Sequence, residues 1–143
     1  METPQRVAQV LGGRAVLRTT VETWVDLDRL VRAGLPKRSL QLLARRAVER
    51  GGSVTAFVYQ VVPPATFKRR SRLSKEESER TERLARVVAL AETLWDGEDE
   101  ARAFLNRPHP LLENQTPLEV ARTEIGARRV EQLLNDAEHG LPL

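Results

Sequence analysis

A stripe of apolar residues at helical spacing constrains the fold of this 143-residue chain more than any other feature. The residues recur at intervals of three and four, which places them on one face of an α-helix. They are Leu84, Val87, Val88, Ala91, Leu94 and Trp95. The helix has clear ends, because Ser74-Lys75-Glu76-Glu77 is a capping box and Asp96-Gly97 stops the pattern. The sequence therefore predicts one long helix over residues 75–95.

Glycine, proline and serine divide the preceding residues into shorter helices. Gly34 stands where a C-terminal glycine cap belongs, and Gly51-Gly52 stops the helix that follows. Ser53 can cap a further helix over residues 54–61, although its Val and Thr residues would also suit a strand. Pro63-Pro64 ends this segment, because a proline ring excludes the preceding residue from helical geometry.

The last third of the chain follows the same pattern. Thr116-Pro117-Leu118-Glu119 is a second capping box, and the final helix ends at Gly140. The predicted buried face of that helix consists of Ile125, Val130, Leu133, Leu134 and Ala137. With only 4% aromatic residues, the chain favours an all-α fold of about eight helices. A seam near residue 74 would divide it into an N-terminal domain, residues 1–74, packed on a C-terminal domain, residues 75–143.

Charge is divided unequally between the two halves. Residues 1–75 hold 15 Lys and Arg against 5 Asp and Glu, a net charge of +10, whereas residues 76–143 hold 8 against 15, a net charge of −7. Such a split suggests one surface for a polyanion and a second surface for another partner. The alternative is that both halves merely expose solvated helix faces.

The residue types argue against catalysis. The chain has no cysteine, which excludes disulfides, thiolate metal sites and cysteine nucleophiles. Neither His109 nor His139 has a neighbouring base or metal-ligand pattern, and Glu98-Asp99-Glu100 precedes a helix, where carboxylates favour the helix dipole. We therefore predict a protein that is not an enzyme, with no metal and no other cofactor. No stretch approaches the roughly 20 apolar residues of a membrane helix, and no secretory signal is present, so we expect a cytoplasmic location.

A cluster of cations follows the predicted helix over residues 54–61. Four of them occur within five residues, at Lys68, Arg69, Arg70 and Arg72. They lie on a short predicted helix over residues 65–72, with Phe67 as its inward anchor. A helix, a tight turn and a short helix match the size of a helix-turn-helix, whose second helix enters the DNA major groove. Thr66 would then contact a base or phosphate, and the cations would hold phosphates or read a guanine; the alternative is an ordinary basic patch.

The apolar tail Leu141-Pro142-Leu143 follows the last predicted helix and has no helical stripe to join. Such a tail is either frayed or docked on a partner. Its proline would reduce the entropy lost on docking, because a proline-containing tail has fewer unfolded conformations to give up.

These segments resemble the Xre/MbcA/ParS antitoxins over nearly the whole chain. Residues 65–70, 73–78 and 83–86 resemble the Xre-like core, and Val10-Leu11-Gly12-Gly13 resembles the opening of this family. The part from Ala101 to Leu143 resembles the family's toxin-binding domain. The matching motifs there are residues 104–112, 116–119, 123–130, 133–134 and 138–140.

The resemblance implies a type II antitoxin whose C-terminal domain covers the active site of a RES-domain toxin, an enzyme that depletes NAD⁺. It also implies an N-terminal domain that dimerises and represses its own operon through operator DNA. The toxin-binding residues implied in this way are Asn106, Arg107, Glu138, His139, Leu141, Pro142 and Leu143. A stand-alone helix-turn-helix transcriptional regulator is the first alternative, and a structural adaptor is the second.

Two positions depart from the family pattern. The family often has Gly-Gly before the Thr-Pro pair, where this chain has Glu113-Asn114, so we expect a different loop backbone there. The family also has an Arg before Thr66 and an aliphatic residue after it, where this chain has Ala65 and Phe67. We expect these changes to alter the detail of DNA recognition.

Overall fold

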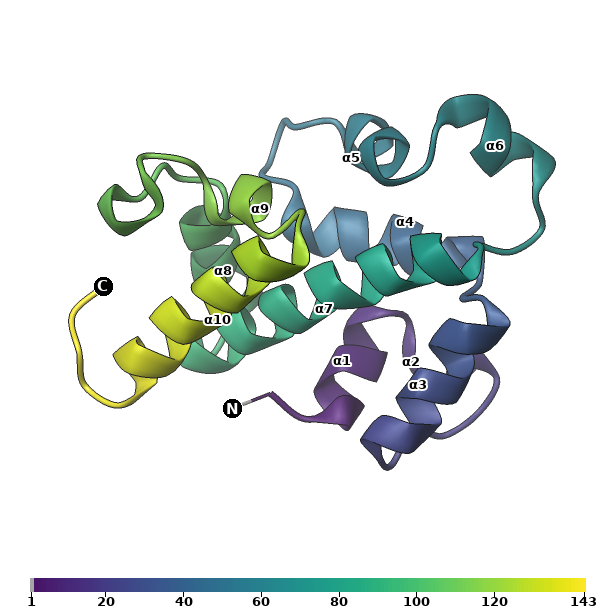
Figure 1. The fold of residues 1–143 in the computed structure, drawn as a ribbon, viewed down its shortest axis with the longest axis horizontal. Coiled ribbons are helices and arrows are strands. Elements are labelled where there is room, and N and C mark those ends of the chain that lie inside the picture. The colour runs from purple at the N-terminus through teal and green to yellow at the C-terminus, as the bar shows by residue number, and fades with distance from the viewer. Residues whose placement is uncertain (1) are drawn as a thin grey trace.

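The computed structural model describes residues 2–143, and over that range the chain is all-α, with no β-strand (Figure 1). Ten α-helices and one 3₁₀ turn occur there, somewhat more elements than the sequence predicted. They are α1 Pro4–Val10, α2 Gly13–Leu17, α3 Trp24–Ala33, α4 Lys37–Ala47, α5 Val54–Val61, α6 Pro64–Arg69, α7 Lys75–Trp95, α8 Glu98–Leu105, η1 Pro110–Leu112, α9 Pro117–Val120 and α10 Glu124–Glu138. None of the described helices is long and apolar enough to cross a membrane.

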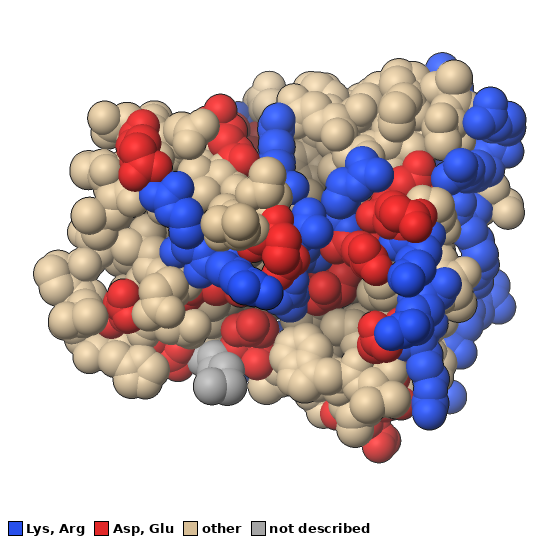
Figure 2. Space-filling model, viewed as in Figure 1, with Lys and Arg blue, Asp and Glu red and all other residues tan. Residues whose placement is uncertain are grey.

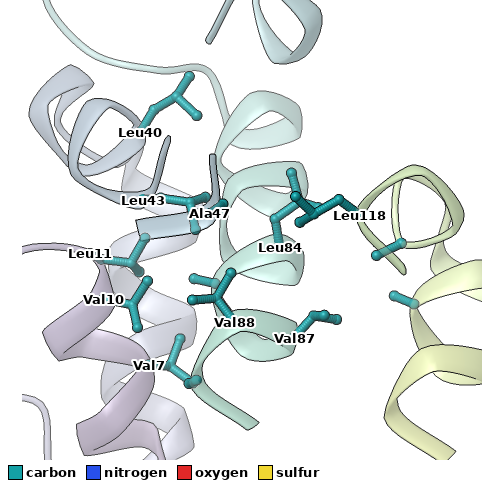
Figure 3. Close-up of a cluster of buried hydrophobic side chains, with 14 of the residues drawn as sticks. Val7, Val10, Leu11, Leu40, Leu43, Ala47, Leu84, Val87, Val88 and Leu118 are labelled. Carbon is teal, nitrogen blue, oxygen red and sulfur yellow. The ribbon is translucent and has the colours of Figure 1, made fainter. Parts of the chain in front are cut away.

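The long helix α7 lies at the centre of the molecule, as its apolar stripe predicts. Helices α1, α3 and α4 pack against it from the N-terminal half, and α8 and α10 pack against it from the C-terminal half (Figure 1). Leu84 and Val88 are buried, and Leu94 is half-buried. In Figure 3, Val88 points toward α1 while Val87 points to the opposite side, toward α10. One helix therefore supplies core residues to both halves.

The local helix signals in the sequence are confirmed. Ser74 accepts a hydrogen bond from Glu77 N, and the Glu77 carboxylate accepts one from Ser74 N, which completes the predicted capping box. Thr116 and Glu119 form the same reciprocal pair at the start of α9. Residues 54–61, which could also have suited a strand, are helical as predicted, and Ser53 caps them by accepting from Ala56 N at 3.0 Å.

The link between α6 and α7 lies across the link between α3 and α4. Leu73 N donates to Leu35 O at 2.9 Å, and Leu35 N donates to the buried Ser78 Oγ at 2.8 Å. Gly34, the predicted glycine cap of α3, has φ 97°, and a Cβ there would lie 2.5 Å from Leu73 O. Only glycine lets the two links approach this closely.

One predicted core residue is wrong. Ile125 is 74% exposed, whereas the buried side of α10 consists of Gly126, Ala127, Val130, Leu133 and Leu134. Gly126 lies directly against the end of α9, and a residue one step away on a helix points about 100° aside. Close packing at Gly126 therefore turns Ile125 outward.

Candidate functional site

A rigid loop between α8 and α9 presents Leu111 on the surface. His109 N donates to Gln115 O at 3.1 Å and Asn114 N donates to His109 O at 2.9 Å, which closes the loop. Leu111 N also donates to His109 Nδ1 at 3.1 Å. Leu111 is 58% exposed, although its neighbour Leu112 is buried. Leu112 of this loop therefore belongs to the core, whereas Leu111 remains exposed to solvent.

The loop contains two consecutive non-glycine residues in the left-handed region, Glu113 at φ 52° and Asn114 at φ 61°. These are the residues that stand in place of the family's Gly-Gly pair. Both residues adopt the left-handed backbone region that glycine favours. The φ values therefore give no sign of the different loop backbone that the sequence led us to expect. Arg129 of α10 holds this conformation, because its Nη2 donates to both Glu113 carboxylate oxygens, at 2.8 and 3.0 Å.

A groove runs between η1 and α10, and the two exposed apolar side chains lie on it. We call it the Leu111–Ile125 groove. It is lined chiefly by Leu111, Leu112, Ile125, Arg128, Arg129 and Leu133. Gln132 and Asp136 complete its edge. The groove has an apolar floor and a polar rim, which is the usual arrangement of a protein-binding surface.

The C-terminal tail turns back from α10 at the predicted glycine. Gly140 has φ 91°, its N–H donates to Ala137 O at 3.1 Å, and Leu141 N donates to Asp136 O at 2.9 Å. These two bonds form a Schellman motif. The tail then has a neighbour that the sequence did not reveal, because Leu143 lines a hollow with the rings of Trp95 and Phe104, whose centroids are 4.7 Å apart and whose planes are inclined at 36°.

The other predicted toxin-binding residues lie in different surroundings. Arg107 is exposed beside the same hollow, and Glu138 and His139 are exposed at the end of α10. Asn106 instead faces the interior, where its Nδ2 donates to Ala47 O and to Arg102 O, both at 2.8 Å. Its side-chain donors tie α8 to the end of α4, which is a structural task.

The region that holds the loop, the groove and α10 matches a known family. Residues 90–140 match the family described as the Antitoxin Xre/MbcA/ParS C-terminal toxin-binding domain. This C-terminal region is therefore similar to an Xre/MbcA/ParS toxin-binding domain. The resemblance drawn from the sequence motifs is thereby confirmed. The matched residues begin inside α7 and include its last turns, residues 90–95.

A curated relative agrees with this assignment. The chain is 28% identical over 102 residues to Antitoxin Xre of Pseudomonas putida strain KT2440. The aligned part covers 68% of this chain and 64% of the relative, which is less than two thirds of the relative's length.

A charged network fastens α10 to the middle of α7. Arg83 Nε donates to Glu124 at 3.0 Å, and Arg86 lies 2.8 Å from Glu82 and 3.2 Å from Glu131. Burial raises the pKa of Glu82 to about 7, against the opposing effect of Arg86. Burial likewise raises the pKa of Glu131. The pKa of Glu124 is lowered, because the hydrogen bond from Arg83 and the charge of Arg86 outweigh its desolvation.

The predicted DNA-binding cations divide into two kinds. Lys68 and Arg69 are exposed on α6 and form no ion pair within residues 2–143. Arg70 instead pairs with Glu77 at 3.0 Å, and Arg72 Nη1 donates to Gly34 O at 2.8 Å. The predicted helix over residues 65–72 was therefore too long, since α6 ends at Arg69 and the last two arginines fasten the link to α7.

Phe67 is the inward anchor of α6 that the sequence predicted, whereas the DNA contact of Thr66 stays a prediction. Thr66 is half-buried in the first turn, and Phe67 is buried. Phe67 packs edge-on against Tyr59, and Lys37 Nζ lies 4.5 Å above its ring. Lys and Arg side chains gather on the right-hand side of Figure 2, where Figure 1 places α6.

Proposed function

We propose that this chain is the antitoxin of a type II toxin–antitoxin pair and that it blocks its toxin by covering the active site. The observation that carries the proposal is the match of residues 90–140 to a toxin-binding domain. The exposed apolar groove of the same region and the tail that follows it provide a surface that a partner protein can cover. No catalytic group is needed for this function, because inhibition is steric.

Co-expression tests this function directly. The chain is produced with a tagged product of the adjacent reading frame, and the pair is purified through the tag. We expect a stable complex and growth of cells that the partner alone would arrest. Separate migration of the two proteins, with no protection of growth, would contradict the proposal.

We further propose a RES-domain toxin that depletes NAD⁺ as the partner. The support is the family resemblance of residues 101–143. Cells that express the partner alone should lose NAD⁺ within the time of growth arrest, and co-expression of this chain should restore the NAD⁺ level. An arrest with unchanged NAD⁺ would point to a toxin of another class.

The tail forms part of the proposed plug, together with Glu138 and His139. Its support is the exposure of Leu141 and the position of Leu143 beside an aromatic hollow. Removal of residues 141–143 should leave α10 folded, because the helix itself ends at Glu138. Growth protection should then be lost. Full protection by the shortened chain would remove the tail from the inhibitory surface.

A second function, operator binding by a dimer, is favoured by the exposed Lys68 and Arg69 on α6, which follows α5 after a tight turn. The double variant Lys68→Ala/Arg69→Ala should weaken binding to the promoter fragment and reduce the slope of log affinity against log salt by about two. Arg107→Ala/Arg128→Ala removes the same charge from the other end and serves as the control. Equal effects of the two variants would indicate general charge attraction without a defined site, and an unchanged slope would exclude α6.

DNA binding without a toxin partner would support the transcriptional-regulator alternative.

A further inference from the structure

We infer that the Leu111–Ile125 groove is the surface on which the partner protein docks, with Leu111 and Ile125 as its two anchors. The occupant is an apolar side chain of the toxin, with a carboxylate beside it that faces Arg128. This inference deepens the proposed antitoxin function and rests on it.

Both anchors are large apolar side chains that the fold leaves in solvent. Ile125 is 74% exposed and Leu111 is 58% exposed, although each is followed directly by a buried residue, Gly126 and Leu112. Burying such a side chain removes apolar surface from water and thereby stabilises a complex. Two of them on one groove form the kind of small apolar patch that marks a binding surface.

Both anchors are held rigidly before any partner arrives. Leu111 is on the loop that His109 closes and that Arg129 fastens to α10, also through an Nη2 contact of 3.4 Å to Leu111 O. Ile125 lies in the first turn of α10, where a β-branched side chain keeps one rotamer. A preorganised anchor loses little entropy on binding. Glu113 and Asn114 adopt left-handed backbone conformations that are unfavourable for residues with a side chain. Strained conformations of this kind are concentrated at binding sites.

The rim of the groove indicates the chemistry of the occupant. Arg128 is exposed, and its only ion pair within residues 2–143 is with Glu124 at 3.6 Å, a long contact in solvent that is worth little. A carboxylate on the partner can therefore engage this guanidinium at small cost. Arg129, by contrast, is committed to Glu113 and acts as a support of the loop.

The location of the groove favours the toxin over a second copy of this chain. Leu111, Ile125 and Arg128 all lie within residues 90–140, the part that matches a toxin-binding domain. Another exposed large apolar pair, Trp24 and Val25, is on α3 in the N-terminal half, outside the matched residues. That pair provides an internal control of equal character.

The test measures affinity for the purified product of the adjacent reading frame. Leu111→Asp and Ile125→Asp place a charge on the groove, and Val25→Asp places one on α3, where Val25 is 58% exposed, as Leu111 is. We expect a loss of at least 30-fold in affinity for each groove variant and less than threefold for Val25→Asp. Arg128→Glu should weaken binding more than Arg128→Ala. All variants should keep the melting temperature of the parent within about 2 °C, because the sites are exposed.

The outcomes separate this inference from the antitoxin proposal. A parent chain that fails to bind the partner contradicts the proposed function, and the inference falls with it. A parent chain that binds, together with groove variants that bind equally well, overturns the inference alone. If Ile125→Asp converts a dimer of the isolated chain to monomers without a change in toxin affinity, the groove is an interface between copies and the inference is wrong.

Discussion

A single glycine, Gly126, determines how closely α9 and α10 pack in the C-terminal half. Gly126 is buried in the first turn of α10, and a Cβ there would lie 1.7 Å from Val120 O, the last residue of α9. Thr123 caps α10 by accepting from Gly126 N at 2.9 Å. The short turn between the two helices therefore depends on the absence of a side chain at this position.

Gly126→Ala should destabilise the protein by at least about 2 kcal/mol, because the added methyl group meets a backbone carbonyl that cannot move without shifting α9. Chemical denaturation of the variant measures this loss. Gly97→Ala is the control, since the nearest atom to its Cβ would be Trp95 O at 4.0 Å. Equal stability of the two variants would show that α9 and α10 are not packed as described.

At the scale of the elements, α7 and its partners carry both the apolar core and a buried charge network. Leu84 is buried between α4 on one side and Leu118 of α9 on the other (Figure 3). Two residues to either side of Leu84, Glu82 and Arg86 face Glu131 of α10. The same interface thus combines apolar packing with carboxylates that lie close together.

Leu84→Ala should lower the free energy of unfolding by about 2–4 kcal/mol, since a buried leucine is truncated in a core that cannot fully collapse. Thermal and urea denaturation give the value. Val25→Ala, at an exposed position, should change stability by less than about 0.5 kcal/mol. A loss below 1 kcal/mol at Leu84 would mean that this face of α7 is open to solvent.

The raised pKa of Glu82 makes stability depend on pH in a definite direction. The folded chain holds this proton up to about pH 7, whereas the unfolded chain releases it near its ordinary pKa of 4.5. Because the native state binds more protons between these values, its stability falls as pH rises through the window. Arg86 and Arg83 oppose the shift, while Glu124 and Glu131 add to it.

Glu82→Gln should therefore remove about 2 kcal/mol of the pH dependence of unfolding between pH 5 and pH 7.5. Urea denaturation at both pH values measures the difference. Glu76→Gln, exposed in the first turn of α7, should retain the slope of the parent. An identical slope in the Glu82 variant would show that this carboxyl ionises normally in the folded protein.

At the scale of the whole molecule, α7 makes the two halves one folding unit. It contributes Val88 to the side of α1 and Val87 to the side of α10, so neither half keeps its core without it (Figure 3). Arg46 of α4 strengthens this union through Glu92, at 2.7 Å. The boundary predicted at residue 74 remains a prediction, and it falls next to the start of the helix that both halves share.

The two tryptophans allow this cooperativity to be measured. Trp24 begins α3, and Trp95 ends α7 against the ring of Phe104. In the single-tryptophan variants Trp24→Phe and Trp95→Phe, fluorescence reports one half each. We expect the remaining tryptophan in either variant to unfold at the same denaturant midpoint as the helical circular dichroism signal. Two separate midpoints within one variant would instead show independent domains.

Local patterns in the sequence were enough for the fold class and for most helix ends. The capping boxes at Ser74 and Thr116, the cap at Ser53 and the stop at Gly140 join atoms at most a few residues apart, so spacing alone reveals them. The apolar stripe of α7 also depends only on helical periodicity. For the same reason, the resemblance of the C-terminal region to a toxin-binding domain could be recognised from its motifs alone.

Tertiary packing decided which side chains remain available for a partner. Asn106 binds Ala47 O, 59 residues away in the sequence, and Arg72 binds Gly34 O, 38 residues away. From the sequence alone, both side chains were predicted to contact a partner, because their distant acceptors within the chain could not be foreseen. Ile125 shows the converse, since a helical stripe assigns it to the core and the close approach at Gly126 turns it outward. Exposure is a property of a residue's neighbours in space, and helical spacing alone does not specify those neighbours.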